Sequence, residues 1–232
     1  LLIRKKEGQA VLAFNEVKQR IFNVVMRDRE KLVTGDSIVE FEKEIDSPLA
    51  HDLLVEIRAI SINPIDIKVK QTVTNKQTSP IILGFDASGI VRAVGDKTSL
   101  FKVGDEVFYA GDMTRDGSNA THQLVDERIV GRKPASLSYD QATALPLTSI
   151  TAWESLFDRL KITKSDQDKT LLLIGAGGGV GSMAIQFAKQ VAGINVIATA
   201  SRAESKDWCK QMGSDVVIGH HDLIGQFKDK NL

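Results

Sequence analysis

Five glycines fall within the seven positions 175–181, directly after the apolar run "TLLLI" and directly before "GSMAIQFAKQVA", whose apolar residues recur at helical spacing. A glycine-rich turn between a buried strand and a helix brings backbone N–H groups and the positive end of the helix dipole to one point. Because glycine has no Cβ, a phosphate group can approach such a turn closely, and the helix can pack close to the strand. The segment therefore predicts a strand, turn and helix that together hold the pyrophosphate of a dinucleotide.

The spacing of these glycines departs from G-x-G-x-x-G by one residue, because a match that starts at Gly175 ends on Val180. The spacing G-x-x-G-x-x-G runs through Gly175, Gly178 and Gly181 and keeps the same mechanics. A glycine turn that serves only helix packing remains the alternative. The candidate cofactor-binding residues of the turn are Gly175, Gly177, Gly178, Gly179, Val180 and Gly181.

The glycine turn lies in a part of the chain where strands alternate with helices. Ser138 is a candidate N-cap, and Pro146 divides the segment after it into two helices. The elements expected after these are strand 170–176, helix 181–192, strand 194–200, helix 203–213, strand 215–219 and the start of another helix. Such alternation predicts an α/β fold with a parallel, doubly wound sheet.

The residues from about 31 to 135 instead form short strand-like runs separated by turn residues, which predicts a mostly antiparallel β domain. In residues 1–26, Val17, Ile21, Val24 and Val25 recur at helical spacing and indicate an amphipathic stretch, to which no chemistry can be assigned. We therefore expect an unassigned segment over 1–26, a β domain over 27–137 and a partial dinucleotide-binding domain over 138–232.

The charge balance of the chain argues against several classes of partner. Thirty Lys and Arg residues offset thirty Asp and Glu residues, so no net field favours nucleic acid or an anionic membrane. No apolar run is long enough to span a bilayer, and the first basic residues follow the apolar start of the chain, unlike those of a secretory signal. The single cysteine, Cys209, excludes an internal disulfide. We expect a cytoplasmic protein.

The end of the strand over 194–200 bears on the choice of cofactor. A site for NAD places an Asp or Glu there, which binds the ribose hydroxyls and repels a 2′-phosphate. This chain instead continues into Ser201 and Arg202, and a hydroxyl beside a guanidinium suits a phosphate dianion. The pair predicts NADPH, although Ser201 could serve only as a helix cap and Arg202 could be solvated.

Five blocks in order resemble the medium-chain dehydrogenase/reductase superfamily, in particular its quinone oxidoreductase-like branch, which includes zinc-type alcohol dehydrogenase-like proteins. The blocks are "IRAISINPIDIK", "PIILGFDASGIVRAVG", "FKVGDEVFYAG", "ALPLTSITAWESL" and "LLLIGAGGGVGSMAIQFAKQ". The resemblance covers about residues 31–232. It implies a GroES-like β domain and a Rossmann domain, with the active site in the cleft between them.

The resemblance also shows where zinc ligands would stand. Zinc-dependent relatives have a Cys near Asn63, a His-Glu pair at Phe85 and Asp86, and a further Cys near Leu147, and a loop with four cysteines that is missing here. Catalytic zinc needs three protein ligands, and Asp86 alone cannot make a site. We expect no catalytic zinc, and the loss of that Lewis acid argues against simple alcohol oxidation.

By the resemblance, Asn63 lies at the active site and donates a hydrogen bond to the acceptor oxygen of the substrate, and Asp66 holds the neighbouring backbone or supports that donor. Thr148 lies near the nicotinamide, and Thr151 matches a threonine of the superfamily. The catalytic candidates are thus Asn63, Asp66 and Thr151, and Thr148 joins the cofactor-binding set. In the alternative, these side chains only satisfy a buried turn or cap a helix.

The resulting hypothesis is an NADPH-dependent, zinc-independent enzyme that transfers hydride to a quinone or an α,β-unsaturated carbonyl compound. Two alternatives stay open, namely a noncatalytic nucleotide-binding relative and an enzyme that prefers alkenals or enones to quinones. The resemblance implies a homodimer. Because the chain ends soon after the third Rossmann strand, we also expect either an incomplete record of a longer protein or partner chains that complete the fold.

Overall fold

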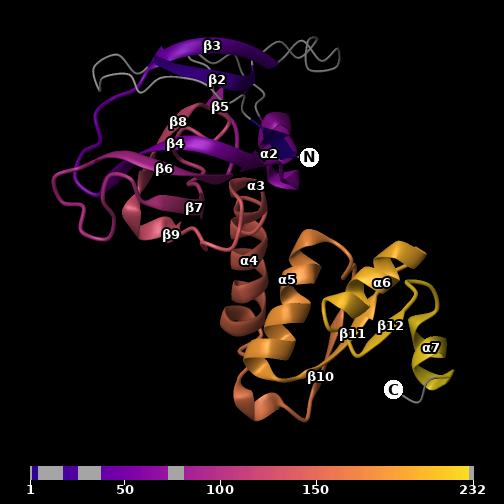
Figure 1. Cartoon of the computed structure of the whole chain (residues 1–232). Coiled ribbons are helices and arrows are strands. Elements are labelled where there is room, and N and C mark those ends of the chain that lie inside the picture. The colour runs from indigo at the N-terminus through magenta and orange to yellow at the C-terminus, as the bar shows by residue number, and fades with distance from the viewer. Residues whose placement is uncertain (1, 5–17, 26–37, 73–80, 230–232) are drawn as a thin grey trace. The chain divides into compact units, whose positions relative to one another are not determined.

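The computed structural model describes residues 2–4, 18–25, 38–72 and 81–229. The chain divides into two compact units, Leu1–Leu147 and Thr148–Leu232, and each is described by itself. Figure 1 shows the first unit in indigo to salmon and the second in salmon, orange and yellow. Within the described residues, no helix has both the length and the apolar character that a membrane crossing requires.

The first unit is built on an antiparallel sheet. Its strand β4 (Asp52–Ser61) pairs with β1 (Leu2–Arg4), with β6 (Asp86–Val94) and with β8 (His122–Asp126). The order continues from β6 to β7 (Glu106–Ala110) and β9 (Val130–Arg132). Apolar side chains of its strands, such as Leu53, Val55 and Val107, are fully buried and form the core. The mostly antiparallel β domain expected from the sequence is confirmed.

A second small sheet corrects the interpretation of the N-terminal segment. Residues Lys18–Val25 form strand β2, which pairs antiparallel with β3 (Ile38–Glu44) and with β5 (Ile81–Ile82). The helical spacing of Ile21, Val24 and Val25 was therefore misleading, and Val17 lies outside the described residues. Residues 20–25 are rich in β-branched and aromatic types, which favour a strand once a partner strand is available.

Two helices of the first unit begin at residues that suit a helix N-terminus. Helix α2 (Pro64–Thr72) starts with proline at its first position, where the missing N–H costs nothing. Helix α3 (Tyr139–Ala142) begins after Ser138, whose side chain accepts from Gln141 N while Gln141 Oε1 accepts from Ser138 N. This capping box confirms the N-cap expected at Ser138.

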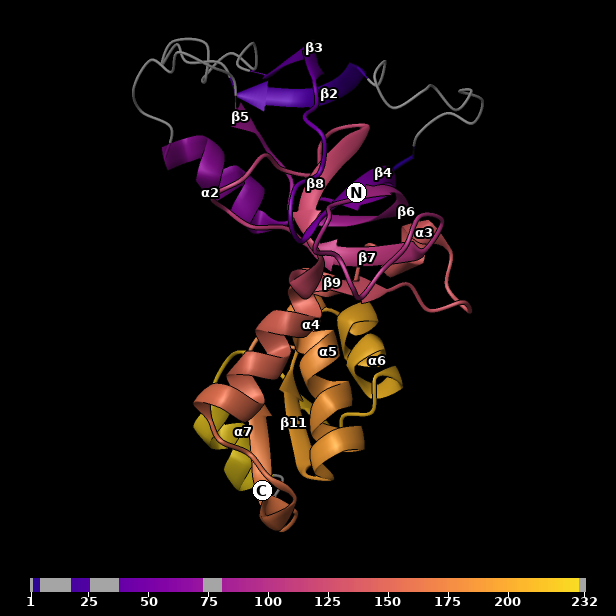
Figure 2. The same cartoon turned by 90° about the vertical axis from the view of Figure 1, so that its left-hand side faces the viewer.

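The second unit contains a parallel sheet in the order β10-β11-β12, with strands Thr170–Leu173, Asn195–Thr199 and Val216–Ile218. The expected alternation of strands and helices is confirmed by α5 (Gly179–Phe187), α6 (Ala203–Gln211) and α7 (Leu223–Asp229). Helix α4 (Pro146–Trp153) begins at the end of the first unit and lies beside α5 in the second (Figure 2), where the Trp153 and Phe187 rings are 5.5 Å apart.

Candidate functional site

The glycine turn connects β10 to α5 in the second unit. Gly175 has a φ of +70°, a backbone conformation that favours glycine. Gly178 is the N-cap of α5, and Ser182 N donates the first bond of the helix to Gly178 O at 2.9 Å. The N–H groups of the first turn, at Gly179, Val180 and Gly181, precede that bond and are the donors that a helix N-terminus offers to an anion.

Packing restricts three of the glycines, and most strictly Gly181, which faces backbone atoms. A Cβ at Gly181 would lie 2.4 Å from Ala176 O, and one at Gly179 would lie 2.9 Å from Thr148 Cγ2. At Gly177, a Cβ would approach Ser205 Cβ to 3.1 Å. These contacts let α5 pack against the turn, against α4 and against α6.

Gly178 differs from these three. A Cβ there would meet only Gly175 O, at the ordinary contact distance of 3.7 Å, and the backbone has an extended conformation that any residue can adopt. The protein itself therefore does not require glycine at position 178. Beside this residue, at the N-cap of α5, the space that a Cβ would fill has no closer neighbour than Gly175 O.

Thr199, at the end of β11, ties the glycine turn to the next two strands. Its fully buried Oγ1 accepts a hydrogen bond from Gly175 N at 2.9 Å and shares another with His220 Nδ1 at 3.0 Å. Its carbonyl accepts from Ala176 N. Thr199 is not predicted as a functional residue, because nothing in the sequence marks a threonine at the end of a buried strand as a support for a turn 24 residues earlier.

Ser201 and Arg202 follow β11 at the same edge of the sheet as the glycine turn, and both are exposed. Arg202, not Ser201, is the N-cap residue of α6, and its side chain makes no cap bond. Within the part of the chain that the structure describes, neither side chain has a hydrogen bond or ion pair. Both are therefore available to a ligand.

In the first unit, Asp86 joins two segments that are distant in sequence. Its Oδ2 accepts from Asn63 Nδ2 at 2.8 Å, and its Oδ1 accepts from Leu147 N, in the first turn of α4, at 2.8 Å. The side chain is completely buried. Burial raises the pKa of Asp86 to about 6, although the two hydrogen bonds act in the opposite direction.

Asp66 lies in the first turn of α2 and accepts from Asn63 N through Oδ2 at 2.7 Å, so it holds the backbone at the start of that helix. Its other oxygen, Oδ1, is buried and has no hydrogen-bond partner within the described residues. Burial also raises the pKa of this carboxyl group. Asn63 and Asp66 are thus brought together, as their spacing suggests.

The hydrogen bonds of Asn63 bear on its expected role as a donor to the substrate. Its Nδ2 donates one proton to Asp86 and the other, at 3.3 Å, to the carbonyl of Ser61. A side-chain amide has two such protons, so no donor is left for a substrate oxygen. Only Oδ1 has no partner among the described residues.

The residues at the expected zinc positions do not fit the metal. Asn63, Asp86 and Leu147 do meet, but both oxygens of Asp86 already accept hydrogen bonds, and Phe85 has an apolar, buried side chain. Among the described residues, no three or more His, Cys, Asp and Glu side chains gather in a way that could hold a metal ion. Catalytic zinc requires three protein ligands.

The two threonine candidates lie on α4. The side chain of Thr148 lies next to Gly179, where it would meet an added Cβ. Thr151 is exposed, and its backbone carbonyl accepts a hydrogen bond from Ser155 Oγ. Both belong to the second unit with the glycine turn, whereas Asn63 and Asp66 belong to the first. Each unit therefore carries one group of candidates.

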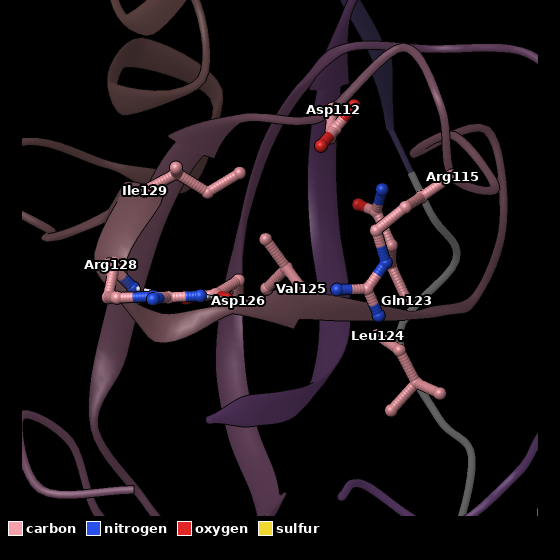
Figure 3. A pocket seen from close by; sticks show the side chains of 8 residues that line it. All are labelled: Asp112, Arg115, Gln123, Leu124, Val125, Asp126, Arg128 and Ile129. Atoms are coloured by element: carbon pink, nitrogen blue, oxygen red, sulfur yellow. Dashed lines mark hydrogen bonds and ion pairs between the residues drawn. The ribbon is translucent and has the colours of Figure 1, made fainter. Parts of the chain in front are cut away.

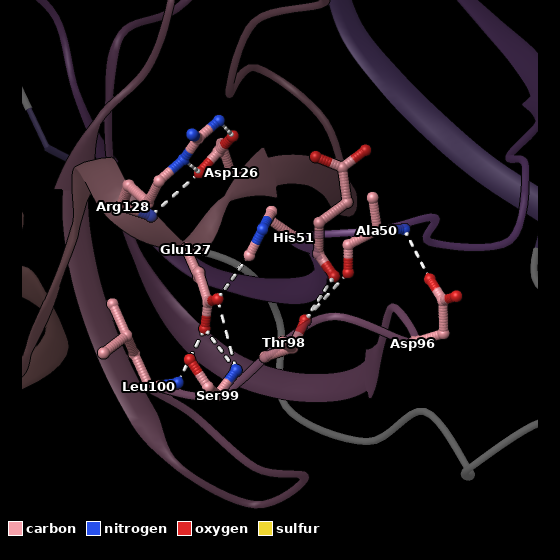
Figure 4. A network of polar contacts seen from close by, with 10 residues as sticks. Ala50, His51, Asp96, Thr98, Ser99, Leu100, Asp126, Glu127 and Arg128 are labelled. Carbon is pink, nitrogen blue, oxygen red and sulfur yellow. Dashed lines mark hydrogen bonds and ion pairs between the residues drawn. The ribbon is translucent and has the colours of Figure 1, made fainter.

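Two further polar features of the first unit are structural. A surface depression of about 270 Å³ (Figure 3) contains Arg115 and Arg128, whose guanidinium groups pair with Asp52 and Asp126 respectively. Their charges are already neutralised. A buried carboxylate, Glu127 (Figure 4), accepts from His51 Nδ1 and from the backbone N–H groups of residues 99 and 100, and so fixes a loop to the strands.

Two family models match the chain. Residues 49–145 match the alcohol dehydrogenase GroES-like domain, and residues 179–230 match the zinc-binding dehydrogenase domain. Each match falls within one of the two units described above.

Individual relatives agree with these models. A zinc-type alcohol dehydrogenase-like protein of Staphylococcus aureus is 46% identical over 206 residues, which are 87% of this chain and 61% of the relative. The 2-methylene-furan-3-one reductase of Solanum lycopersicum is 34% identical over 72% of this chain and 44% of its own length. A quinone oxidoreductase structure from Pseudomonas syringae has a TM-score of 0.74 and 27% identity, covering 93% of this chain and 63% of that one. The chain thus spans about three fifths, or less, of the length of these relatives.

Proposed function

Because the chain belongs to the medium-chain dehydrogenase/reductase superfamily, we propose that it is an NADPH-dependent oxidoreductase that acts without zinc. The proposed reaction transfers hydride to a quinone or an α,β-unsaturated carbonyl compound. Two of the relatives carry names of this kind, a quinone oxidoreductase and a 2-methylene-furan-3-one reductase. The activity of the whole protein is part of the proposal, since the chain spans only part of each relative.

The observation that carries the proposal is the open space at Gly178. The protein itself would accept a side chain at this position, whereas a side chain there would collide with a bound phosphate group. When bound, the nicotinamide cofactor supplies the hydride. The N–H groups of the first turn of α5 would hold the pyrophosphate, with the helix dipole behind them. Thr199 would keep the turn in the binding conformation through its bond to Gly175 N.

The preference for NADPH rests on the residues after β11. Ser201 and Arg202 are exposed, and the side chains of both are without a partner in the described part of the chain. A guanidinium can donate two charged hydrogen bonds to a 2′-phosphate. No carboxylate follows the strand at residues 200–202, where an NAD site would place one.

The proposal of a zinc-independent reaction rests on the side chains at positions 63, 85, 86 and 147. A conjugated acceptor suits such a site, because the charge that follows hydride addition spreads to an oxygen that water or a hydrogen-bond donor can stabilise. Whether quinones or enones are preferred depends on residues that line the reactant pocket. The proposed homodimer and cytoplasmic location come from the resemblance and the composition, and both remain predictions.

A noncatalytic nucleotide-binding relative is the second candidate. It is favoured by the network around Asp86, in which the amide protons of Asn63 and both carboxylate oxygens are satisfied within the protein. Such a network can stabilise a fold without touching a reactant.

The experiment that tests the proposal is a fluorescence titration of the 232-residue chain with NADPH and, separately, with NADH, followed by turnover assays with quinones and enones. We expect tighter binding of NADPH and an acceptor-dependent oxidation of the cofactor. Binding without turnover on any acceptor would favour the noncatalytic candidate. Equal affinity for both cofactors would contradict the 2′-phosphate assignment. The mass of the chain in solution, measured on the same sample, would test the homodimer.

A further inference from the structure

The hydrogen bonds of Asn63 fix which atom of its side chain can meet another molecule. The Nδ2 group lies 2.8 Å from Asp86 Oδ2 and 3.3 Å from Ser61 O. Above the raised pKa of Asp86, where its carboxylate is ionised, both of these partners can only accept. If the amide were turned over, Oδ1 would face two acceptors and both bonds would be lost. The network therefore allows one orientation, in which Oδ1 is the atom without a partner in the described residues.

Asp86 is well placed to impose this orientation. Its carboxylate is completely buried and its other oxygen accepts from Leu147 N at 2.8 Å, so the side chain is held from two sides. The partners come from residues 23 and 61 positions away, which makes Asp86 the link between the start of α2 and the start of α4. An aspartate held in this way has no freedom to follow a rotation of Asn63.

We propose that Asp86 is a positioning residue that turns Asn63 so that its carbonyl Oδ1 faces the reacting molecule, and that the site consequently recognises a hydroxyl group. This inference rests on the proposed function, which places Asn63 beside the reactant. Under this proposal Asn63 accepts a hydrogen bond from the ligand, whereas the sequence predicted that it donates one. Asn63 does not polarise the carbonyl of an oxidised substrate.

The chemical class that fits this site carries an O–H group at the reacting end. Addition of one hydride, which carries both electrons, and of one proton from solvent converts a quinone into a hydroquinone with two hydroxyl groups. One of these hydroxyl groups would donate to Asn63 Oδ1. An acceptor without a partner at Asn63 Oδ1 favours the hydroxyl form over a form that has only acceptors.

The substitution Asp86→Asn tests the proposal. The amide introduced at position 86 can still accept from Leu147 N through Oδ1, but its NH2 group would face Asn63. The side-chain amide of Asn63 would then rotate by half a turn, so that its Oδ1 accepts from the NH2 group at position 86. Its own NH2 group would face the reactant instead, and its bond to Ser61 O would be lost. We expect the side-chain amide protons of Asn63, identified by their loss in Asn63→Asp, to exchange with solvent at least about tenfold faster in Asp86→Asn than in the parent.

Ligand binding provides the second measurement. Hydroquinone and its dimethyl ether present the same oxygens, but only hydroquinone can donate. With NADP+ present, the parent chain should bind hydroquinone more tightly than the ether, and Asp86→Asn should reduce this preference about fivefold or reverse it, as expected when one hydrogen bond is lost. Asp96→Asn, at an exposed residue that accepts from Ala50 N, is the matched control and should alter neither measurement.

The outcomes are distinguishable. Faster exchange together with a lost or reversed preference supports the proposal. Equal exchange rates in the parent and in Asp86→Asn overturn the positioning role, whatever the ligands do. An unchanged preference overturns the assignment of Oδ1 to the reactant. If neither compound binds the parent chain, the proposed function and the hydroxyl recognition both fail, while the exchange rates still decide whether Asp86 orients Asn63.

Discussion

The hydroxyl oxygen of Thr199 accepts a hydrogen bond from the backbone nitrogen of Gly175 at 2.9 Å, and it shares a second one with His220 Nδ1. The end of β11 thus holds the first glycine of the turn that follows β10, a strand to which it is paired in parallel register. Since Gly175 has a positive φ and no side chain of its own, this bond is what fixes the start of the turn.

We expect Thr199→Val to weaken both the fold and cofactor binding. Valine has nearly the same shape but cannot accept from Gly175 N, and a buried donor without a partner costs about 1–3 kcal/mol. Chemical denaturation and an NADPH titration would measure the two effects. Thr199→Ser keeps the hydroxyl and should retain most of the affinity, and an affinity as high in the valine variant as in the parent would show that the bond does not shape the site.

The Arg202→Ala substitution should separate the two cofactors. The exposed guanidinium has no carboxylate partner in the described part of the chain, so its removal should leave the fold intact. Loss of a charged hydrogen bond to the 2′-phosphate should weaken NADPH binding by about 1.5–3 kcal/mol, with NADH binding nearly unchanged. Lys210→Ala, at an exposed residue in the last turn of the same helix, is the control for general charge. Equal losses for both cofactors would argue against a role in recognising the phosphate.

The buried Asp86 predicts a particular dependence of stability on pH. The pKa of Asp86 is about 6 in the folded protein, compared with the ordinary value of 3.8 that applies to the unfolded chain. The folded state therefore binds the proton more tightly than the unfolded state does. The contribution of this group to the free energy of unfolding is therefore fully present below pH 3.8 and is lost as the pH rises through 6. The full difference is about 3 kcal/mol.

Denaturation of the parent and of Asp86→Asn at pH 4 and pH 7.5 would test this. The free energy of unfolding of the parent, relative to the variant, should fall as the pH rises, because asparagine does not titrate. A constant difference between the two proteins at both pH values would show that Asp86 stays ionised in the fold at little cost. Asp96→Asn, at an exposed position, should show no such relative change.

The elements of the second unit were predictable because their signals are local. Apolar runs and the glycine cluster lie within a few residues of the structures that they determine. The strand over Lys18–Val25 was missed because its apolar spacing fits a helix, and only pairing with β3 decides between the two. Local patterns cannot report such long-range pairing.

The candidate sites divide in the same way. The glycine turn was predicted, and its packing contacts explain three of its glycines, but whether it binds a cofactor stays a prediction. The role of Asn63 could not be foreseen, because the loss of its donors depends on Asp86, which is 23 residues away. Asp86 itself was weighed only as a zinc ligand. A carboxylate inside the apolar run "IILGFDASGIV" is the signal that could have identified it as a buried, bonded group.

The glycine turn offers a contrast that separates ligand binding from packing. At Gly181, a Cβ would lie 2.4 Å from Ala176 O, so Gly181→Ala should force α5 away from the turn and destabilise the protein by about 1–3 kcal/mol. At Gly178, a Cβ has only one neighbour at 3.7 Å, so Gly178→Ala should destabilise the protein only through the poorer N-cap that alanine provides, by about 0.5–1 kcal/mol. Gly178→Val adds bulk at the same place and serves as the stronger test of cofactor binding.

If a phosphate group occupies the space at Gly178, both substitutions there should weaken NADPH and NADH alike, by about tenfold for alanine and more for valine, while the fold persists. The pyrophosphate is common to the two cofactors, which distinguishes this effect from the selective loss expected for Arg202→Ala. A parallel loss of stability and affinity at both glycines, or full affinity in Gly178→Val, would instead mean that the turn is a packing device. Because stability and affinity are measured on the same variants, a loss of affinity that is caused only by unfolding would be recognised.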